Sequence, residues 1–342
     1  MIAIRDIITD VNTNSSPAIG MPRLEGKLDV VAYSGNAELF GARNLLIADR
    51  SGFRILLKRC RQKSMHLRLL HRTQELNRLL SEDRFAPIRE IAVAGKKCTM
   101  DGQSYILFTF IEATNGYHCL RNGTRSKTQL PLLESTLNLC STLDEAGVLS
   151  AESNSTATAI RTRYHSACSG KCMTNVPTAI APMDRDCRAV RQTLVHNDLG
   201  PANLLIAGDA LWVLDWEYWD VSYSIFNFFD VLTHFFSLIS ISRLCRRRDL
   251  DYFAFFLKWN AKRSRKASSI VAQYATQMGY DRIDAGFADM LFELYLMNKS
   301  TSQLRVYGHQ SNLDRHWQRL AGRYRDYRGE FRAFWNSRIR SP

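Results

Sequence analysis

Two linked segments near the middle of the chain decide its fold. They read Leu194-Val195-His196-Asn197-Asp198-Leu199-Gly200-Pro201-Ala202-Asn203-Leu204-Leu205-Ile206 and Leu211-Trp212-Val213-Leu214-Asp215-Trp216-Glu217. The apolar runs 204–206 and 211–214 flank a short turn that contains glycine, a pattern that predicts a β-hairpin. Residues at the open end of a hairpin lie opposite each other, roughly 4.5–5.5 Å apart at Cα. We therefore expect Asn203, just before the first strand, to lie close to Asp215, just after the second.

These side chains suit phosphoryl transfer. An amide oxygen and a carboxylate are hard ligands of the kind that Mg²⁺ takes while it keeps substrate phosphates in its shell. Asp198 precedes Asn203 on the same loop, where its carboxylate can face a substrate hydroxyl. Such reactions need metal ions that neutralise phosphate charge and a carboxylate that accepts or orients the hydroxyl proton. The spacing predicts a phosphotransferase site, and a plain polar loop between core strands is the alternative.

The same segments resemble the catalytic core of the aminoglycoside phosphotransferase and choline kinase superfamily. The family pattern is similar to V-H-G-D-x-x-P-x-N-I-L followed by I-D-W-E, and the likeness is tight from Leu194 to Tyr218 and looser from about Leu28 to the C-terminus. The resemblance implies an α+β, protein-kinase-like fold with two lobes. The small N-lobe would be rich in β-strands, and the larger C-lobe would be mainly helical.

The resemblance also implies roles for single residues. Asp198 would be the catalytic carboxylate, and His196 would brace the catalytic loop. Asn203 and Asp215 would hold Mg²⁺, with ATP as the phosphate donor. Asn197 stands where the family commonly has Gly. Because Asn tolerates unusual backbone angles, this difference concerns the conformation of the loop rather than its chemistry.

The part of the chain before residue 113 has mostly the pattern of strands. Apolar runs at 44–48 and 53–58 flank a turn that contains glycine, which predicts a hairpin. Apolar residues at helical spacing predict a helix over 65–80. Strands are expected again at 88–94 and 105–111. The order resembles the nucleotide-binding lobe of a kinase.

By the same resemblance, Lys58 contacts the nucleotide phosphates and Glu75, on the following helix, is its ion-pair partner. A solvated lysine at a strand end and an exposed helical glutamate are the alternatives. The other implied nucleotide contacts are Ser34, Gly35 and Asn36 in a phosphate-covering loop and Phe110 and Glu112 in a hinge that binds adenine. A plain buried strand is the alternative for the hinge.

The composition shift near residue 113 divides the chain. We expect a flexible arm over 1–26, a nucleotide-binding lobe over 27–113 and a helical lobe over 114–342, with a helix over 132–148. The most apolar stretch, 223–241, is interrupted by Asn227, Asp230 and His234, so a buried core helix is expected there rather than a membrane span. Asp230 resembles an aspartate that supports the catalytic loop in small-molecule kinases.

The acceptor is expected to be a small molecule. Asp215 is followed by Trp216-Glu217 and not by Phe-Gly, and the chain has no Ala-Pro-Glu segment, which argues against a protein substrate. The aromatic residues after Asp215 resemble those of members associated with surface glycans, which favours a sugar or glycan precursor. An aminoglycoside kinase and a non-catalytic, kinase-like nucleotide-binding scaffold are the alternatives.

The charge and the cysteines bear on partners and location. The formal net charge is +13, which suits phosphorylated substrates, anionic lipid or nucleic acid, yet no nucleic-acid recognition fold accompanies the basic runs. The basic, aromatic C-terminus from Arg315 onward predicts peripheral contact with an anionic membrane, or a helix that packs on its own domain. Eight scattered cysteines and the lack of a signal sequence predict a cytoplasmic protein. A zinc site at His165, Cys168, Cys172 and Cys187 is the weaker alternative to free thiols.

Overall fold

The computed structural model describes residues 29–34, 42–48, 54–60, 62–100, 103–122, 129–147, 153–167, 188–236, 265–308 and 311–340. The expected arm over 1–26 therefore lies outside the described residues. The chain forms two compact units, each described by itself. The first contains Met1–Glu112 and Val213–Glu217, and the second contains Ala113–Trp212 and Tyr218–Pro342.

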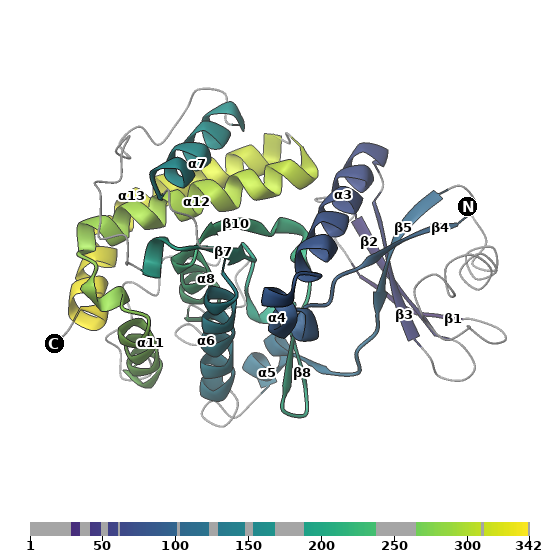
Figure 1. Cartoon of the computed structure of the whole chain (residues 1–342), viewed down its shortest axis with the longest axis horizontal. Helices are drawn as coiled ribbons and strands as arrows, with labels where there is room; N and C mark the ends of the chain where they lie inside the picture. The colour runs from purple at the N-terminus through teal and green to yellow at the C-terminus, as the bar shows by residue number, and fades with distance from the viewer. Residues whose placement is uncertain are drawn as a thin grey trace. The chain divides into compact units, whose positions relative to one another are not determined.

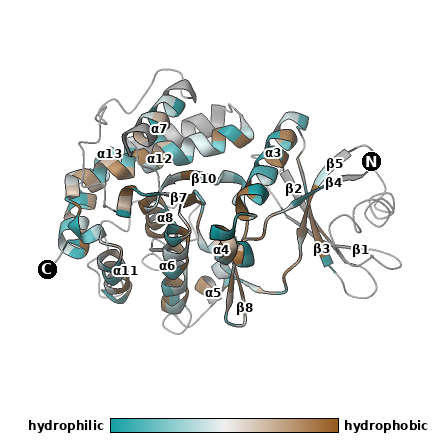
Figure 2. Cartoon of the chain, in the orientation of Figure 1, coloured by the Kyte–Doolittle hydropathy of each residue, from teal (hydrophilic) through white to brown (hydrophobic). Residues whose placement is uncertain are grey.

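The first unit is built on an antiparallel sheet. Its described strands are β1 (Asp29–Ser34), β2 (Ala42–Ala48), β3 (Arg54–Cys60), β4 (Lys96–Met100) and β5 (Gln103–Thr109), in the order β1-β2-β3-β5-β4 (Figure 1). The β2–β3 pairing sets Leu45 opposite Leu57, and Leu57 in turn lies opposite Leu107 of β5. Brown, hydrophobic residues run along β3 in Figure 2, where Ile55 and Leu57 are fully buried. The hairpin predicted over 44–58 is confirmed.

Helix α3 (Lys63–Leu80) lies against this sheet and confirms the helix predicted over 65–80. Its buried face carries Met65, Leu69, Leu76 and Leu80, at the three-to-four residue spacing of an amphipathic helix. The strand expected over 88–94 is wrong, because the short helix α4 (Ala86–Ile91) follows a turn at Asp83–Phe85. Pro87 in the first helical turn has a backbone angle suited to helix, and Ile88 is fully buried.

The segment Val213–Glu217 belongs to the first unit through backbone contacts. The Val93 N–H donates to the Val213 carbonyl at 3.0 Å, and Arg72 Nε donates to the Glu217 carbonyl at 2.9 Å. Residues from the end of the predicted hairpin are thereby attached to α3 and to the chain after α4. This attachment brings Asp215 and Glu217 to β3, where Lys58 lies.

The second unit is mainly helical (Figure 1). Its described helices are α5 (Gly116–Asn122), α6 (Gln129–Glu145), α7 (Ser153–Ala167), α8 (Ile225–Asp230), α11 (Arg265–Gln277), α12 (Ala285–Tyr307) and α13 (Ser311–Phe334). Turns of π-helix, Val231–Phe236 and Trp335–Ile339, extend α8 and α13. Helix α6 confirms the helix predicted over 132–148. With the sheets, these helices make the chain an α+β protein.

Two small sheets of the second unit carry the predicted catalytic loop. Strand β7 (Gln192–Val195) pairs antiparallel with β10 (Asp220–Tyr223), a pairing that the sequence patterns did not predict. Strands β8 (Leu204–Ala207) and β9 (Ala210–Val213) form the predicted hairpin, and β6 (Thr114–Asn115) pairs with β8. Gly208 has a φ of 59° in the hairpin turn, a conformation that favours glycine.

Aromatic side chains fill the core around α8. Phe226, Phe228 and Phe229 are fully buried and contact rings of α12 and the C-terminal helix, such as Phe292 and Trp335. The apolar stretch over 223–241 is therefore a buried core element as far as Thr233. No helix in the described part of the chain is long and apolar enough to cross a bilayer.

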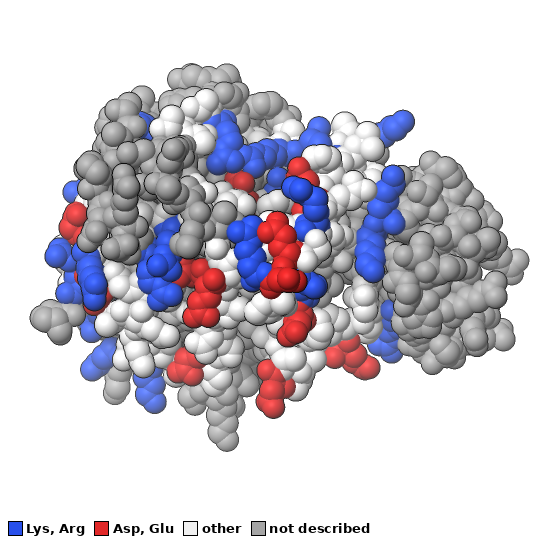
Figure 3. Space-filling model, in the orientation of Figure 1, with Lys and Arg blue, Asp and Glu red and all other residues white. Residues whose placement is uncertain are grey.

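Four aromatic residues of the C-terminal helix and its π-helical extension, Tyr324, Phe331, Phe334 and Trp335, pack inward. These side chains are buried, while Arg332 forms an ion pair with Asp289 of α12 at 2.6 Å. Basic and acidic side chains are interspersed on the face of the molecule seen in Figure 3. Membrane contact through this segment stays a prediction.

Candidate active site

The predicted catalytic loop begins where β7 ends, and His196 and Asn227 fix its first residues. His196 is fully buried, and its backbone N–H donates to Asn227 Oδ1 at 3.2 Å. Asn227 Nδ2 donates to the Leu194 carbonyl at 3.0 Å. The side-chain amide of Asn227, on α8, therefore bonds backbone groups of both Leu194 and His196 at the end of β7. The Asp198 N–H in turn donates to His196 Nδ1 at 3.2 Å. His196 was expected to brace the catalytic loop, and its imidazole contacts the backbone of Asp198 in that loop.

Asn197 has the unusual backbone expected from its place in the motif. Its φ is 63°, in the left-handed region that Asn tolerates better than most residues. The side chain is also fully used. Nδ2 donates to the Tyr218 carbonyl at 2.9 Å and to Ser302 Oγ at 3.2 Å, and Oδ1 accepts from Asn298 Nδ2 at 3.0 Å. Asn therefore supplies both the turn that Gly would allow and a link to α12.

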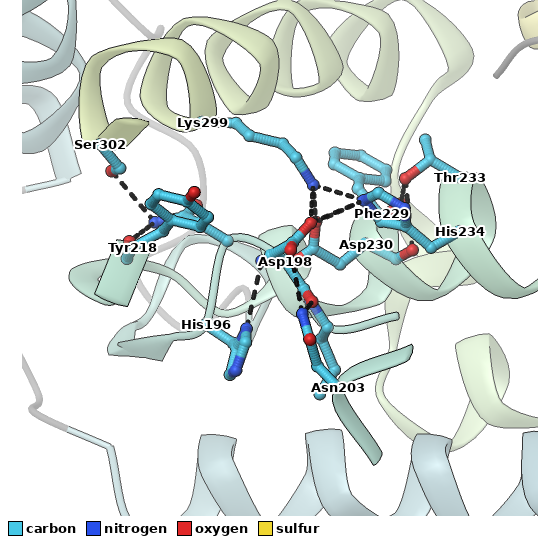
Figure 4. A network of polar contacts seen from close by, with 12 residues as sticks. His196, Asp198, Asn203, Tyr218, Phe229, Asp230, Thr233, His234, Lys299 and Ser302 are labelled. Carbon is cyan, nitrogen blue, oxygen red and sulfur yellow. Dashed lines mark hydrogen bonds and ion pairs between the residues drawn. The ribbon is translucent and has the colours of Figure 1, made fainter. Parts of the chain in front are cut away.

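Asp198 and Asn203 contact each other directly (Figure 4). Asn203 Nδ2 donates to Asp198 Oδ2 at 2.9 Å and to the Asp198 carbonyl at 2.8 Å. The Asp198 side chain is 31% exposed, so its carboxylate is reachable from solvent. Both contacts of Asn203 use its amide nitrogen, which leaves Oδ1 as an oxygen ligand. A metal ion that prefers hard oxygen ligands fits this donor.

Asp230 supports the catalytic loop by a hydrogen bond to its backbone. It is fully buried, and its Oδ2 accepts the Leu199 N–H at 3.1 Å while Oδ1 accepts Tyr295 Oη at 2.5 Å. Burial by itself would raise the pKa of Asp230, but the Lys299 ammonium and the hydrogen bonds from Tyr295 and the Leu199 N–H together outweigh burial and lower it. Asp230 is therefore ionised and contacts the catalytic loop, which agrees with the supporting role expected for it.

Lys299 of α12 brings a cation to the same cluster (Figure 4). Its Nζ lies 3.0 Å from Asp230 Oδ1, 3.5 Å from Asp198 Oδ1 and 2.5 Å from His234 Nε2. Burial would lower the pKa of Lys299, but Asp230, followed by Tyr295 and Asp198, raises it above its usual value. For His234, burial and the Lys299 charge lower the pKa to about 4, so this imidazole is neutral at pH 7.

In the first unit, Lys58 binds two carboxylates. Its Nζ lies 2.8 Å from Asp215 Oδ1 and 2.5 Å from Glu217 Oε2. Lys58 and Glu217 are buried, whereas the Asp215 side chain is 40% exposed. Burial acts to lower the pKa of Lys58, but the two carboxylates outweigh it and raise the pKa, so the ammonium is charged. Lys58 is therefore a buried cation beside the expected metal ligand Asp215.

Asp215 itself has a left-handed backbone with a φ of 58°. Few residues besides glycine, Asn and Asp adopt this conformation, and strained backbone of this kind clusters at functional sites. Lys58 engages Oδ1, and Oδ2 is left as an oxygen donor that also fits Mg²⁺. Asn203 belongs to the second unit and Asp215 to the first, so their expected proximity stays a prediction.

The structure differs from the sequence on the partner of Lys58. Glu75 lies 3.5 Å from His71, one helical turn earlier on α3, and its side chain is 44% exposed. Lys58 pairs instead with Glu217, whose backbone Arg72 holds at the middle of α3. The predicted Lys58–Glu75 pair is thus corrected to Lys58–Glu217, because Glu217 is buried beside Lys58.

The remaining predicted positions are placed as follows. Phe110 follows β5 and lies under the Arg54 guanidinium, 5.3 Å from its ring centroid, and Glu112 is exposed. Ser34 ends β1, while Gly35 and Asn36 lie outside the described residues. His165 falls within α7, and Cys168, Cys172 and Cys187 also lie outside the described residues. Within the described part of the chain, no group of three or more His, Cys, Asp or Glu side chains could hold a metal ion.

No protein-family model and no curated protein matches the chain. Among solved structures, a choline kinase from Cryptosporidium parvum is 12% identical over 97% of this chain and 92% of its own, with a TM-score of 0.38. The amicoumacin kinase hAmiN, solved with AMP-PNP, Ca²⁺ and Ami, is 11% identical over 94% and 96%, with a TM-score of 0.41. A macrolide 2′-phosphotransferase from Brachybacterium faecium is 12% identical over 83% and 94%, also with a TM-score of 0.41.

These structures are of two kinases and a phosphotransferase. Identities and TM-scores at this level carry no function to this chain.

Sequence reasoning missed three side chains of the site, namely Glu217, His234 and Lys299. The signal for Glu217 is its position two residues after Asp215, between the aromatic residues Trp216 and Tyr218. These aromatic neighbours are buried, and Glu217 is buried with them. His234 was noted only as a polar interruption of an apolar stretch. Lys299 follows the apolar run Leu294-Tyr295-Leu296-Met297, and a lone lysine next to such a run is a signal of a buried, paired charge.

Proposed function

We propose that this chain is an ATP-dependent phosphotransferase that transfers the γ-phosphate to a hydroxyl group of a small molecule. The observation that carries the proposal is the state of Asp198. Its carboxylate is partly exposed, hydrogen-bonded at Oδ2 to Asn203, and faced at Oδ1 by Lys299. A carboxylate that is oriented in this way and reachable from solvent is what phosphoryl transfer to a hydroxyl requires.

Asp198 would act on the acceptor. Its carboxylate would accept a hydrogen bond from the acceptor hydroxyl and orient that oxygen toward the γ-phosphate. It would take up the proton as the new P–O bond forms and the bond between the γ-phosphorus and the bridging oxygen breaks, so that ADP leaves. His196 and Asp230 would serve this step by holding the backbone N–H groups of Asp198 and Leu199. The loop would then be in place before the acceptor arrives, so little freedom is lost at the moment of reaction.

Lys58 and the two oxygen donors would act on the donor nucleotide. Asn203 Oδ1 and Asp215 Oδ2 each offer a hard oxygen ligand, and Mg²⁺ would supply neutralisation of the phosphate charge. Lys58 is a buried, charged ammonium that would contact the phosphates. The proposed nucleotide contacts at Ser34, Gly35 and Asn36, and at Phe110 and Glu112 for adenine, complete this side of the site.

We further propose a sugar or glycan precursor as the acceptor. The support is the likeness in sequence to members associated with surface glycans. Phe226, Phe228 and Phe229, part of that likeness, are fully buried among other rings, so they are core residues and not acceptor contacts. An aminoglycoside is the competing acceptor, and a panel of acceptors distinguishes the two.

The test is transfer of γ-labelled phosphate from Mg-ATP into sugars, aminoglycosides and a fractionated cell extract. Asp198→Asn should abolish the transfer while Mg-ATP still binds. Asp209→Asn, at an exposed position in the β8–β9 turn, is the matched control and should transfer at the wild-type rate. Label in a sugar or lipid-glycan fraction that is lost in Asp198→Asn would support the proposal.

Other outcomes contradict it in distinct ways. Label in aminoglycosides alone would keep the phosphotransferase and replace the acceptor. Label in proteins alone would overturn the assignment to small molecules. Mg-ATP binding without transfer to any fraction would favour a non-catalytic scaffold. Turnover that survives in Asp198→Asn would remove Asp198 from the mechanism.

A further inference from the structure

We propose that Lys299 is a positioning residue for the reaction. Asp230 and His234 fix the Lys299 ammonium, and the ammonium in turn holds the Asp198 carboxylate through Oδ1. The inference rests on the proposed function of Asp198. It adds a residue from α12, about a hundred positions along the chain from the loop, to the machinery of phosphate transfer.

The contacts of Lys299 account for all its donors. An ammonium group has three N–H bonds. Asp230 Oδ1 lies at 3.0 Å and His234 Nε2 at 2.5 Å, and the third N–H has Asp198 Oδ1 and Tyr295 Oη as acceptors, each at 3.5 Å. The lysine side chain is only 7% exposed, so solvent does not compete for these positions. Figure 4 shows the ammonium next to the carboxylates of Asp198 and Asp230 and to the His234 ring.

His234 contributes by being neutral. A neutral imidazole with Nε2 as acceptor takes one N–H of Lys299 without repelling the ammonium charge. The cluster then holds two carboxylates, Asp198 and Asp230, against one cation, Lys299. The cation is shared between the buried carboxylate that anchors it and the partly exposed one that faces solvent.

The catalytic loop has a glycine, Gly200, where its backbone passes His234. Gly200 passes so close to His234 that a Cβ added at Gly200 would lie 3.1 Å from the Cβ and 3.3 Å from the Cγ of His234. Such contacts are tighter than most side chains make, so the His234 ring packs directly on the catalytic loop. On α12, Asn298 and Ser302 contact Asn197 from the same side as Lys299. Buried polar groups are costly unless they are paired, and Asn298, Lys299 and Ser302 each contact a side chain of the loop.

With Asn203 on Oδ2 and Lys299 on Oδ1, the Asp198 carboxylate is fixed at both oxygens. Fixing both oxygens sets the plane of the carboxylate as well as its place. A misplacement of about 1 Å can cost a reaction roughly a hundredfold in rate. Loss of Lys299 should therefore lower kcat and leave the binding of Mg-ATP unchanged.

In the purely structural alternative, Lys299 serves only to compensate the charge of buried Asp230. A double variant separates this role from the positioning of Asp198. Lys299→Met should reduce stability, because it leaves Asp230 buried without a cation. Lys299→Met combined with Asp230→Asn removes both charges and should recover that stability. An Asn at 230 still has an oxygen for the Leu199 N–H, so the loop keeps that hydrogen bond.

The experiment measures kcat and KM for Mg-ATP in phosphate release to water without an added acceptor, together with unfolding in urea. For both Lys299→Met and the double variant, we expect kcat to fall roughly a hundredfold and KM to stay within about twofold. Asp230→Asn alone should retain more turnover than the double variant. Lys266→Met, at an exposed position of α11, should match the wild type throughout.

The result that overturns the proposal is a double variant that folds stably and turns over at the rate of Asp230→Asn alone, since Lys299 would then serve stability only. A rise in KM with unchanged kcat would overturn it as well. Asp198→Asn run in parallel distinguishes these failures from failure of the proposed function. Full turnover in Asp198→Asn, or no turnover by the wild type with or without sugar and aminoglycoside acceptors, would remove the proposed function itself.

Discussion

Glu217 Oε2 lies 2.5 Å from Lys58 Nζ, and both side chains are buried. The pair joins strand β3 to the segment that carries Asp215, which shares the same ammonium at 2.8 Å. Glu217 therefore occupies the place beside Lys58 that the sequence assigned to Glu75. Because a buried charge needs a partner, Glu217 and Asp215 together hold the Lys58 ammonium in place.

Glu217→Gln should weaken Mg-ATP binding, and Glu75→Gln should not. Without the Glu217 charge, Lys58 keeps only one of its two carboxylate partners, Asp215, and its ammonium is held less firmly. Hydrogen bonds to charged groups contribute about 1.5–3 kcal/mol, so we expect a loss of at least about tenfold in affinity for Glu217→Gln. Titration calorimetry with Mg-ATP measures the change. A larger loss for Glu75→Gln than for Glu217→Gln would restore Glu75 as the partner.

Lys58→Met should destabilise the protein by about 3–5 kcal/mol, since it leaves Glu217 buried without its cation. The double variant Lys58→Met with Glu217→Gln should recover most of this stability, because no buried charge is left unpaired and the Asp215 carboxylate is 40% exposed to water. Unfolding in urea at neutral pH measures both. Equal stability of the single and double variants would show that the pair does not form in solution.

Asn197→Gly should cost stability although Gly fits the backbone. The φ of 63° suits Gly, but the change removes the bonds of the Asn197 side chain to Tyr218, Ser302 and Asn298. Buried partners left unsatisfied cost about 1–3 kcal/mol each, so we expect a loss in that range or larger. The loss should shrink when Ser302→Ala is already present. A neutral or stabilising Asn197→Gly would mean that only the backbone conformation matters.

Gly116→Ala should impair turnover. A Cβ at Gly116 would lie 2.7 Å from the Pro201 carbonyl oxygen, and the adjacent Asn115 Nδ2 donates to the Ala202 carbonyl at 2.7 Å. The turn that leads into Asn203 would have to shift. We expect kcat to fall by at least about tenfold, as small misplacements in an active site do. Gly329→Ala, on the exposed side of α13 with no neighbouring atoms within 4 Å, is the control and should raise stability by up to about 1 kcal/mol.

Stability should fall as the pH is lowered from about 6.5 to 4, because of His234. Its pKa is lowered from 6.5 to about 4 by burial and by Lys299. Between these values the unfolded chain binds a proton that the folded protein does not, so the stabilising contribution is present above about pH 6.5 and lost on acidification. The full loss is about 3 kcal/mol.

Urea unfolding at pH 7.5, 6 and 4.5 measures this dependence. His234→Gln, whose amide oxygen can still accept from Lys299, should show a weaker loss on acidification than the wild type. His118→Gln, at an exposed position, serves as the control. Identical pH dependence in the wild type and His234→Gln would contradict the prediction.

Local patterns predicted most elements that have a strong period or a turn. The hairpin at β2–β3, the hairpin at β8–β9 and the helices α3 and α6 all follow from the spacing of apolar residues and from glycine in the turns. Helix α4 was missed because its six residues are too few to show a helical period. The β7–β10 pair was missed because its short strands are joined only in the folded chain.

The sequence by itself determined the chemistry of the loop, since His196, Asn197, Asp198 and Asn203 lie within eight consecutive residues and local hydrogen bonds join His196 and Asn203 to Asp198. Only the tertiary structure decided which distant charges complete it. Lys299 reaches Asp198 across 101 positions of the chain, and Glu217 reaches Lys58 across 159. A buried charge is stable only beside an opposite charge or a hydrogen-bonding partner, and which one lies beside it depends on how helices and strands pack.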